Sequence, residues 1–350
     1  MEGKVGVLIV DDSAYMRVVI KDMLESDQEV QVVGSAKDGL EAIEKTKELS
    51  PDVVLLDIQM PRMDGLATLR RIMKECPTRV IMLSAMDKFD DQLPLRALES
   101  GAVDFISKPS GPVSIDIVKF RDRIIEIVKV AAGARVEVLK KTSGPLPAKL
   151  GALRKSSGGE TRVIVIAAST GGPRALEVIF AALPHELPAP LFVVQHIPEE
   201  FSVSFAKRLD AAHGPKVVLA TDEMRAEKGV AYLAPGGKHL ELYWRGATSL
   251  QMRLRDGAPV KFVKPSADVL FKSAAECLGS NVLAVVLTGM GSDGADGAVA
   301  IRSVGGRVIV QDEQTSVAYS MPRSVVEAEA ADKVAPLEDI ASLIVKFLEK

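Results

Sequence analysis

The chain has 350 residues, of which 26% are charged and 47% hydrophobic, and its formal net charge is −3, a composition that suits a globular protein of about two domains. The small net charge argues against bulk electrostatic attraction to nucleic acid, although it leaves a local basic patch open. Two distant cysteines, Cys76 and Cys277, exclude a cysteine-rich metal site. No apolar run approaches the roughly 18 residues of a membrane span, and an apolar strand follows Met1 without a signal-peptide core, so we expect a cytoplasmic protein that does not insert into membranes.

Residues 1–130 alternate between strand and helix patterns five times. Strands are expected near 5–10, 31–36, 53–56, 79–84 and 103–106, each followed by an amphipathic helical stretch. Such alternation predicts a parallel sheet with helices on both faces. In a sheet of this kind, functional groups gather beyond the carboxyl ends of the strands. The polar residues that follow these strands are therefore the first candidates for a site.

Five polar residues stand at that edge. Asp11 and Asp12 follow the first strand, Asp57 closes the third, Ser84 the fourth, and Lys108 follows the fifth. Crowded carboxylates repel one another unless a cation joins them, and oxygen ligands suit Mg²⁺. An aspartate beside Mg²⁺ and a lysine is a candidate phosphoryl acceptor, because both cations neutralise charge on the transferring group. Helix-capping acids and a solvated lysine are the plainer interpretation, but they explain five such residues at one edge poorly.

Four motifs in this part are similar to those of the receiver domain of two-component response regulators: residues 11–13, 57–65, 84–85 and 108–109. The resemblance implies a (βα)5 fold and phosphorylation of Asp57 by a histidine kinase. It implies that Mg²⁺ is held by Asp12, Asp57 and the backbone carbonyl of Gln59, with Asp11 nearby. It also implies a switch through Ser84 and Phe105, in which Ser84 and Lys108 hydrogen-bond the phosphate and the loop after the fourth strand moves inward.

The linker is expected at residues 131–160, around the end of a helix that should finish near Ala132. These residues contain many glycines and prolines, few large apolar side chains, and more lysine and arginine than acid. This composition predicts a flexible basic linker between domains at 1–130 and 161–350. A DNA-contacting tail is the more specific alternative, although no neighbouring segment has the pattern of a helix-turn-helix.

The second part again alternates between strands and helices. Strands are expected at 163–168, 191–195, 216–220, 230–234, 282–288 and 307–310, and helices at 174–183 and 201–212. The first strand has four consecutive β-branched residues and no polar face, which is typical of a parallel strand buried on both sides. We therefore expect a second α/β domain with a doubly wound, mainly parallel sheet and glycine-rich loops at its carboxyl edge.

Ser169 stands between the first of these strands and its helix. Pro173 suits the first turn of that helix, because a missing N–H costs nothing there. At a helix N-terminus, backbone N–H groups and the helix dipole favour developing negative charge, so a serine oxygen could attack a carbonyl while neighbouring amides hold the oxyanion. A phosphate-binding or purely structural turn explains this short segment equally well.

His196 is the histidine that directly follows a strand, as Ser169 does. The others lie toward the opposite edge or in a hairpin or edge strand: His185, His213 and His239. Asp293 lies in the glycine-rich loop after strand 282–288, within reach of an imidazole. Ser169, His196 and Asp293 would make a nucleophile, a general base and an orienting carboxylate. Alternatively, His196 and Asp293 are structural, or the loop binds a nucleotide phosphate, although it lacks the P-loop and dinucleotide fingerprints.

Several motifs resemble the catalytic domain of the CheB family of chemotaxis protein-glutamate methylesterases: residues 168–173, 194–198, 233–239, 265–271, 287–294, 311–313 and 321–322. With the receiver and the linker, the likeness covers essentially the whole chain. It implies hydrolysis of γ-glutamyl methyl esters on cytoplasmic helices of chemoreceptors, deamidation of certain receptor glutamines, and a chemotaxis kinase as phosphodonor. It implies that Ser169 is the nucleophile, His196 the base and Asp293 its partner, with Thr170 and Met290 beside the reacting carbonyl and no metal in the ester reaction.

The chain departs from the motifs of these families at four places: Gln59, Ser292, Val263-Lys264 and Ser320. The Val263-Lys264 departure makes deamidation a weaker expectation than ester hydrolysis. Fusion of a switch to a hydrolase suggests that the receiver covers the catalytic cleft until Asp57 is phosphorylated. Two other classes stay open: a response regulator whose second domain binds a partner or DNA without chemistry, and a nucleotide-binding output domain.

Overall fold

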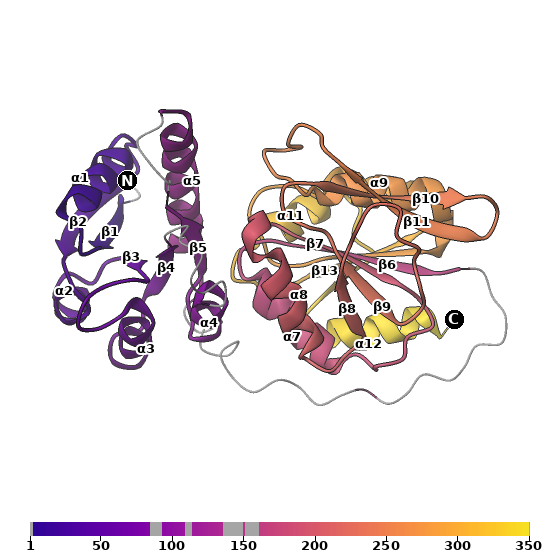
Figure 1. Ribbon diagram of the computed structural model, residues 1–350, viewed down its shortest axis with the longest axis horizontal. Helices are drawn as coiled ribbons and strands as arrows, with labels where there is room; N and C mark the ends of the chain where they lie inside the picture. Colours follow the sequence, from indigo (N-terminus) through magenta and orange to yellow (C-terminus); the bar gives the residue numbers. More distant parts are fainter. Residues whose placement is uncertain (1–2, 85–92, 109–113, 136–149, 151–160, 350) are drawn as a thin grey trace. The chain divides into compact units, whose positions relative to one another are not determined.

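The computed structural model describes residues 3–84, 93–108, 114–135, 150 and 161–349 (Figure 1). The chain divides into two compact units, Met1–Gly144 and Pro145–Lys350. Most of the segment expected to be a linker lies outside the described residues, so its flexibility and the boundaries 1–130, 131–160 and 161–350 stay predictions. In the described part of the chain, every helix is too short or too polar to cross a membrane.

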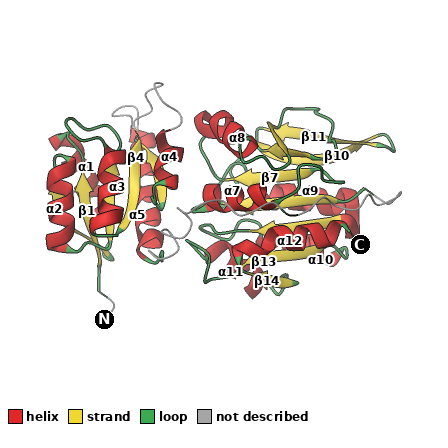
Figure 2. Ribbon diagram, turned by 90° about the horizontal axis from the view of Figure 1, so that it is seen from below, coloured by secondary structure: helices red, strands yellow, loops and turns green. Residues whose placement is uncertain are grey.

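The first unit is a five-stranded parallel sheet in the order β2-β1-β3-β4-β5. Its strands are β1 (Val5–Val10), β2 (Val30–Ala36), β3 (Val53–Asp57), β4 (Arg79–Ser84) and β5 (Asp104–Ser107). Its helices are α1 (Ala14–Glu25), α2 (Gly39–Leu49), α3 (Gly65–Glu75), α4 (Leu93–Glu99) and α5 (Ser114–Ala132). Helices α1 and α5 cover one face and α2, α3 and α4 the other (Figures 1 and 2). The predicted alternation of strands and helices is confirmed.

The second unit has a seven-stranded parallel sheet in the order β14-β13-β12-β6-β7-β9-β8. Its strands are β6 (Val163–Ala168), β7 (Leu191–Gln195), β8 (Lys216–Leu219), β9 (Val230–Leu233), β12 (Val282–Val286), β13 (Arg307–Gln311) and β14 (Lys333–Ala335). An antiparallel hairpin, β10 (His239–Arg245) and β11 (Ser249–Arg255), stands apart from the sheet. The expected doubly wound sheet is therefore confirmed, and His239 begins a hairpin as expected.

Helices cover both faces of this second sheet. They are α7 (Gly172–Ala182), α8 (Ser202–Asp210), α9 (Ala267–Leu278), α10 (Ala295–Ser303), α11 (Ser320–Glu327) and α12 (Leu337–Leu348), with short 3₁₀ turns at Glu199–Phe201 and Gly279–Asn281. Helices α7, α8 and α12 lie on one face, and α9, α10 and α11 on the other (Figure 1). The helix expected at 201–212 is thus a 3₁₀ turn followed by α8, and the strand expected to reach 288 ends at Val286.

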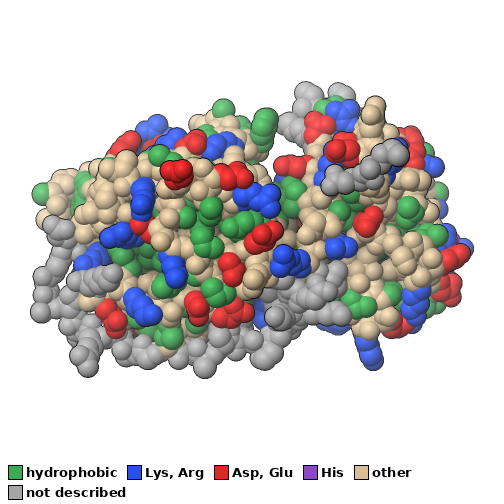
Figure 3. All heavy atoms as spheres, turned by 180° about the vertical axis from the view of Figure 1, so that it is seen from behind, with side chains coloured by type: hydrophobic (Ala, Val, Ile, Leu, Met, Phe, Trp, Pro, Cys, Tyr) green, Lys and Arg blue, Asp and Glu red, His purple; other side chains and the backbone are tan. Residues whose placement is uncertain are grey.

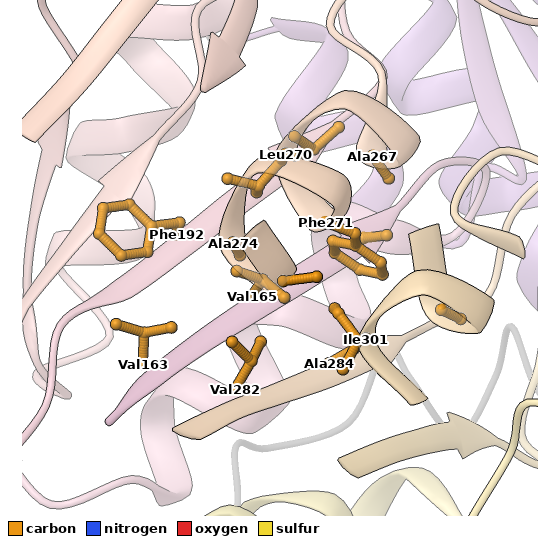
Figure 4. Close-up of a cluster of buried hydrophobic side chains, with 14 of the residues drawn as sticks. Val163, Val165, Phe192, Ala267, Leu270, Phe271, Ala274, Val282, Ala284 and Ile301 are labelled. Carbon is orange, nitrogen blue, oxygen red and sulfur yellow. The ribbon is translucent and has the colours of Figure 1, made fainter. Parts of the chain in front are cut away.

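A buried cluster joins α9 to the sheet. Phe271 and Leu270 of α9 are fully buried and pack with Phe192 of β7 and with Val165 of β6 (Figure 4). Burial of a phenylalanine or leucine side chain stabilises the fold by about 1.5–3 kcal/mol each. Because several such side chains anchor α9, its first turn is held at a defined place beside the carboxyl ends of the central strands.

Figure 3 shows the distribution of charged side chains on one face of the molecule. On the face drawn in Figure 3, acidic and basic side chains of the described residues are interspersed rather than gathered by sign. This mixture agrees with a formal net charge of only −3.

Candidate functional site

Three carboxylates of the first unit lie together at the carboxyl edge of its sheet. One ligand oxygen from each of Asp11, Asp12 and Asp57 lies within 4.8 Å of the others. The Lys108 ammonium is 2.7 Å from Asp11 Oδ2 and 2.7 Å from Asp57 Oδ2. The end of β3 and the segments that follow β1 and β5 therefore bring together residues that are far apart in the sequence.

The electrostatics of this cluster favour a bound cation. Burial raises the pKa of Asp57 above its ordinary value; Lys108 opposes that rise and the charge of Asp11 adds to it. One ammonium therefore does not balance three acids. Asp12 is exposed, and with Gln59 it lines a cavity of about 700 Å³. An oxygen-only donor set with room for water fits Mg²⁺, which retains several waters when protein carboxylates bind it.

The residues expected to act as a switch lie on the last two strands of this sheet. Ser84 ends β4 and Phe105 lies within β5, and both are buried. The Lys108 N–H donates to the Ser84 carbonyl at 2.7 Å, so the two strand ends are joined directly. Residues 85–92, which hold the loop expected to move, lie outside the described residues, and the switch stays a proposal.

Ser169 stands at the end of β6 in a tightly held turn. Its N–H donates to the Thr288 carbonyl at 3.1 Å, and its carbonyl accepts from the Gly172 N–H at 2.7 Å and from Gln195 Nε2 at 3.0 Å. Gly171 precedes α7 with φ +76°, a left-handed conformation that glycine adopts without strain. The strand, the turn and the helix therefore hold a nearly buried serine at the N-terminal end of α7.

His196 follows β7, the strand next to β6, and contacts Asp293. Its N–H donates to the Ala168 carbonyl at 3.1 Å, which places it beside the residue that precedes Ser169. Its Nε2 lies 2.9 Å from Asp293 Oδ2. Among the described residues, the Ser169 hydroxyl makes no hydrogen bond, to His196 or to any other group. Catalytic hydrogen bonds are often long before substrate binds, so this geometry is compatible with a triad.

Asp293 is bound by the N-terminus of α9. The Ser266 hydroxyl donates to its Oδ1 at 2.6 Å, the Ala267 N–H to its Oδ2 at 2.6 Å, and the Asp268 N–H to its Oδ1 at 3.1 Å. Ser266 occupies the N-cap position, yet its own side chain bonds no helix N–H; the carboxylate of Asp293 takes that role. Burial raises the pKa of Asp293, but hydrogen bonds from His196, Ser266 and Ala267 outweigh it and lower that pKa.

The sequence reasoning did not identify Ser266 as part of this site. A serine before an apolar helix is a recognisable N-cap signal, but the signal says nothing about a partner elsewhere in the chain. Ser266 is further held by His239, whose Nδ1 accepts from the Ser266 N–H at 3.2 Å and whose Nε2 contacts the Ala258 carbonyl at 3.0 Å. His239 therefore supports the site from the hairpin, whereas His185 and His213 lie in loops after α7 and α8.

The two residues expected beside the reacting carbonyl, Thr170 and Met290, are both buried. Among the described residues, the Met290 N–H donates no backbone hydrogen bond. Gly289 lies against Ser169, because an added Cβ there would be 2.7 Å from Ser169 Cβ and would also overlap Met321 Sδ. Glycine at this position lets the loop approach the serine closely.

Two family models match the chain. Residues 164–344 match the family model described as CheB methylesterase, and residues 7–117 match the response regulator receiver domain. The first match covers more than half of the chain. The chain belongs to the CheB methylesterase family.

Members of this family resemble the chain over nearly its whole length. A relative from Halalkalibacterium halodurans, named protein-glutamate methylesterase/protein-glutamine glutaminase, is 44% identical over 99% of this chain and 99% of its own. A relative of the same name from Pyrococcus horikoshii is 42% identical over 100% of this chain and 95% of its own. The crystal structure of the Thermotoga maritima CheB methylesterase catalytic domain matches with a TM-score of 0.53 and 39% identity, covering 54% of this chain and 99% of that one.

Proposed function

We propose that the second unit hydrolyses glutamate γ-methyl esters on cytoplasmic helices of methyl-accepting chemoreceptors, and by the same route deamidates glutamines. The observation that carries the proposal is the contact of 2.9 Å between His196 Nε2 and Asp293 Oδ2 beside the strand end that bears Ser169. Membership of the CheB methylesterase family, with relatives named as methylesterases and glutaminases, supports the same substrates. The protein would act in the cytoplasm and contribute to chemotactic adaptation.

The proposed reaction uses Ser169, His196 and Asp293 in turn. Ser169 Oγ attacks the ester carbonyl as its proton passes to His196 Nδ1, since Nε2 faces Asp293. The Met290 N–H stabilises the oxyanion, with Thr170 beside it. His196 then gives the proton to the leaving methoxide, which departs as methanol and leaves a γ-glutamyl ester on Ser169. Water attacks this ester with His196 again as base, and the product carboxylate and the serine are released.

Asp293 has two tasks in this scheme. It fixes the imidazole with Nε2 protonated, and its negative charge stabilises the imidazolium that forms during each proton transfer. The lowered pKa keeps the carboxylate ionised at neutral pH. The positive end of the α9 dipole supports this charge as well.

We also propose that phosphorylation of Asp57 by a chemotaxis histidine kinase raises the esterase rate. Mg²⁺ would be held by Asp11, Asp12 and Asp57 with the Gln59 carbonyl, and would neutralise charge on the transferring phosphoryl group. Lys108 and Ser84 would hydrogen-bond the phosphate, and Phe105 would respond to the movement of Ser84. The buried position of Asp57 between Lys108 and Asp11 supports this assignment.

Methanol release from methylated receptor helices tests both parts of the proposal. The wild-type chain should release methanol, Ser169→Ala should release none above the uncatalysed rate, and a phosphodonor with Mg²⁺ should accelerate the wild type but not Asp57→Asn. Release that is independent of Ser169 would refute the serine mechanism. Equal rates with and without phosphodonor would refute the regulation alone.

A further inference from the structure

Residues 260–263 form a tight hairpin turn on the path between β11 and α9. The Val260 N–H donates to the Val263 carbonyl at 3.1 Å, and the Val263 N–H donates back at 3.0 Å. Both central residues are left-handed, Lys261 with φ +49° and Phe262 with φ +67°. Two consecutive positive φ angles define a turn that favours Asn-Gly, because a side chain with a Cβ is strained there. A bulky aromatic residue in this conformation is an outlier.

The Phe262 side chain is not buried by any other part of the described structure. Its exposure is 101%, the highest among the large apolar residues that the structure exposes. A single exposed apolar residue is ordinary on a protein surface. Phe262 differs because glycine or asparagine would make the same turn with less strain and no exposed ring. Strain retained by surrounding structure is a feature of functional sites.

Lys261 fixes this turn beside the catalytic acid. Its ammonium donates to the Ser292 carbonyl at 3.0 Å and lies 2.8 Å from Asp268 Oδ2 and 3.1 Å from Asp296 Oδ2. Ser292 directly precedes Asp293. Lys261 therefore points toward these groups, whereas the Phe262 side chain is fully exposed.

The segment that follows the turn contacts Asp293 directly. Ser266, three residues after Val263, donates its hydroxyl to Asp293 Oδ1 at 2.6 Å. The turn is thus fastened to Asp293 through Ser266 on one side and to the neighbouring Ser292 on the other. The turn that carries Phe262 is therefore connected at two places to the segment that contains Asp293.

We propose that Phe262 anchors the protein substrate, its ring packing against apolar side chains of the segment that carries the esterified glutamate. The inference rests on the proposed function and specifies how the site selects a protein over a small ester. An amphipathic helix presents apolar side chains three and four residues from a given position, so a helix that inserts a glutamate ester at Ser169 has such side chains available to the Phe262 ring. A small ester fills only the site around Ser169.

The test compares two substrates on the intact, phosphorylated chain. One is a methylated receptor helical fragment, and the other is an N-acetylglutamate γ-methyl ester that ends at the reacting residue. Phe262→Ala should raise KM for the helical fragment by about tenfold, the effect of losing one well-placed aromatic anchor, with kcat unchanged. The same variant should leave kcat/KM for the small ester unchanged, and Phe262→Tyr should behave as wild type. Val334→Ala, at an exposed apolar residue of β14, is the matched control and should change neither.

Each other outcome overturns the inference in a different way. An unchanged KM for the fragment would show that the ring makes no contact with it. An equal loss on both substrates would mean that the turn acts through the position of Asp293. A faster reaction of the unphosphorylated variant with unchanged KM would assign Phe262 to regulation. If the wild-type chain releases no methanol from either substrate, the proposed function itself fails and the inference fails with it.

Discussion

Replacement of Ser266 by alanine removes the shortest side-chain contact to Asp293. The hydroxyl donates to the carboxylate at 2.6 Å, and both residues are buried. A hydrogen bond to a charged group contributes about 1.5–3 kcal/mol. Three donors remain on Asp293, namely His196, Ala267 and Asp268, so the lower end of that range applies. We expect Ser266→Ala to reduce the free energy of unfolding of the second unit by about 1.5 kcal/mol.

The same substitution should loosen the orientation of the carboxylate and so of His196. We expect kcat for methanol release to fall by about tenfold, the equivalent of about 1.4 kcal/mol, with KM unchanged. Urea unfolding can be followed through Trp244, the only tryptophan of the chain, which lies in the second unit. Steady-state kinetics with a methylated receptor fragment supply kcat and KM.

Two control variants separate the loss of kcat in Ser266→Ala from the general effect of removing a hydroxyl group. Ser266→Thr keeps the donor and should retain most of the wild-type kcat. Ser273→Ala removes a hydrogen-bonded hydroxyl farther along α9, where Ser273 accepts from the Leu242 N–H, and should lower stability without lowering kcat. A Ser266→Ala variant with wild-type kcat would refute the claim that this hydroxyl orients the acid.

Four further substitutions or conditions have defined outcomes. Asp293→Asn should lower kcat by about 10⁴-fold, because an amide favours the wrong imidazole tautomer. Gly289→Ala should lower the rate at which a phosphonate ester labels Ser169 by about 100-fold, since the added methyl group displaces the serine. Folding lowers the pKa of Asp293, so the ionised carboxylate contributes fully to stability above its unfolded pKa of about 3.9. This contribution is lost as the pH falls through the lower pKa of the folded state. Urea unfolding at several acidic pH values should show the loss in the wild type and not in Asp293→Asn. Mg²⁺ should raise the unfolding temperature of the first unit in calorimetry, and Asp12→Asn should remove most of that rise.

Local sequence patterns were sufficient for most of the two sheets. The apolar runs of β1, β3 and β6 have almost no exposed residue, and a strand of this kind is legible without tertiary information. Weakly patterned elements were missed. Strand β14 has three residues, two of them exposed, and it exists because it pairs with β13. The positions of α9 to α12 were likewise not predicted, since their apolar faces match several partners.

Only the parts of the candidate site that lie at strand ends could be predicted from the sequence. Ser169 and His196 follow adjacent parallel strands, so simple topology placed them at one edge. The contact between Ser266 and Asp293 joins residues 27 positions apart and depends on where α9 packs. Phe262 has no sequence signature at all, because its importance lies in a backbone conformation and in full exposure.

The placement of Asp293 on a helix end has a consequence for catalysis. The acid lies in a loop with left-handed glycines at Gly291 and Gly294, and such a loop alone would not orient a carboxylate. The N–H groups of α9 need an acceptor in any case, so a single carboxylate both caps the helix and serves His196. Phe271 and its neighbours hold α9 on the sheet. The precision of the proposed site therefore depends on the core packing that holds α9 against the sheet.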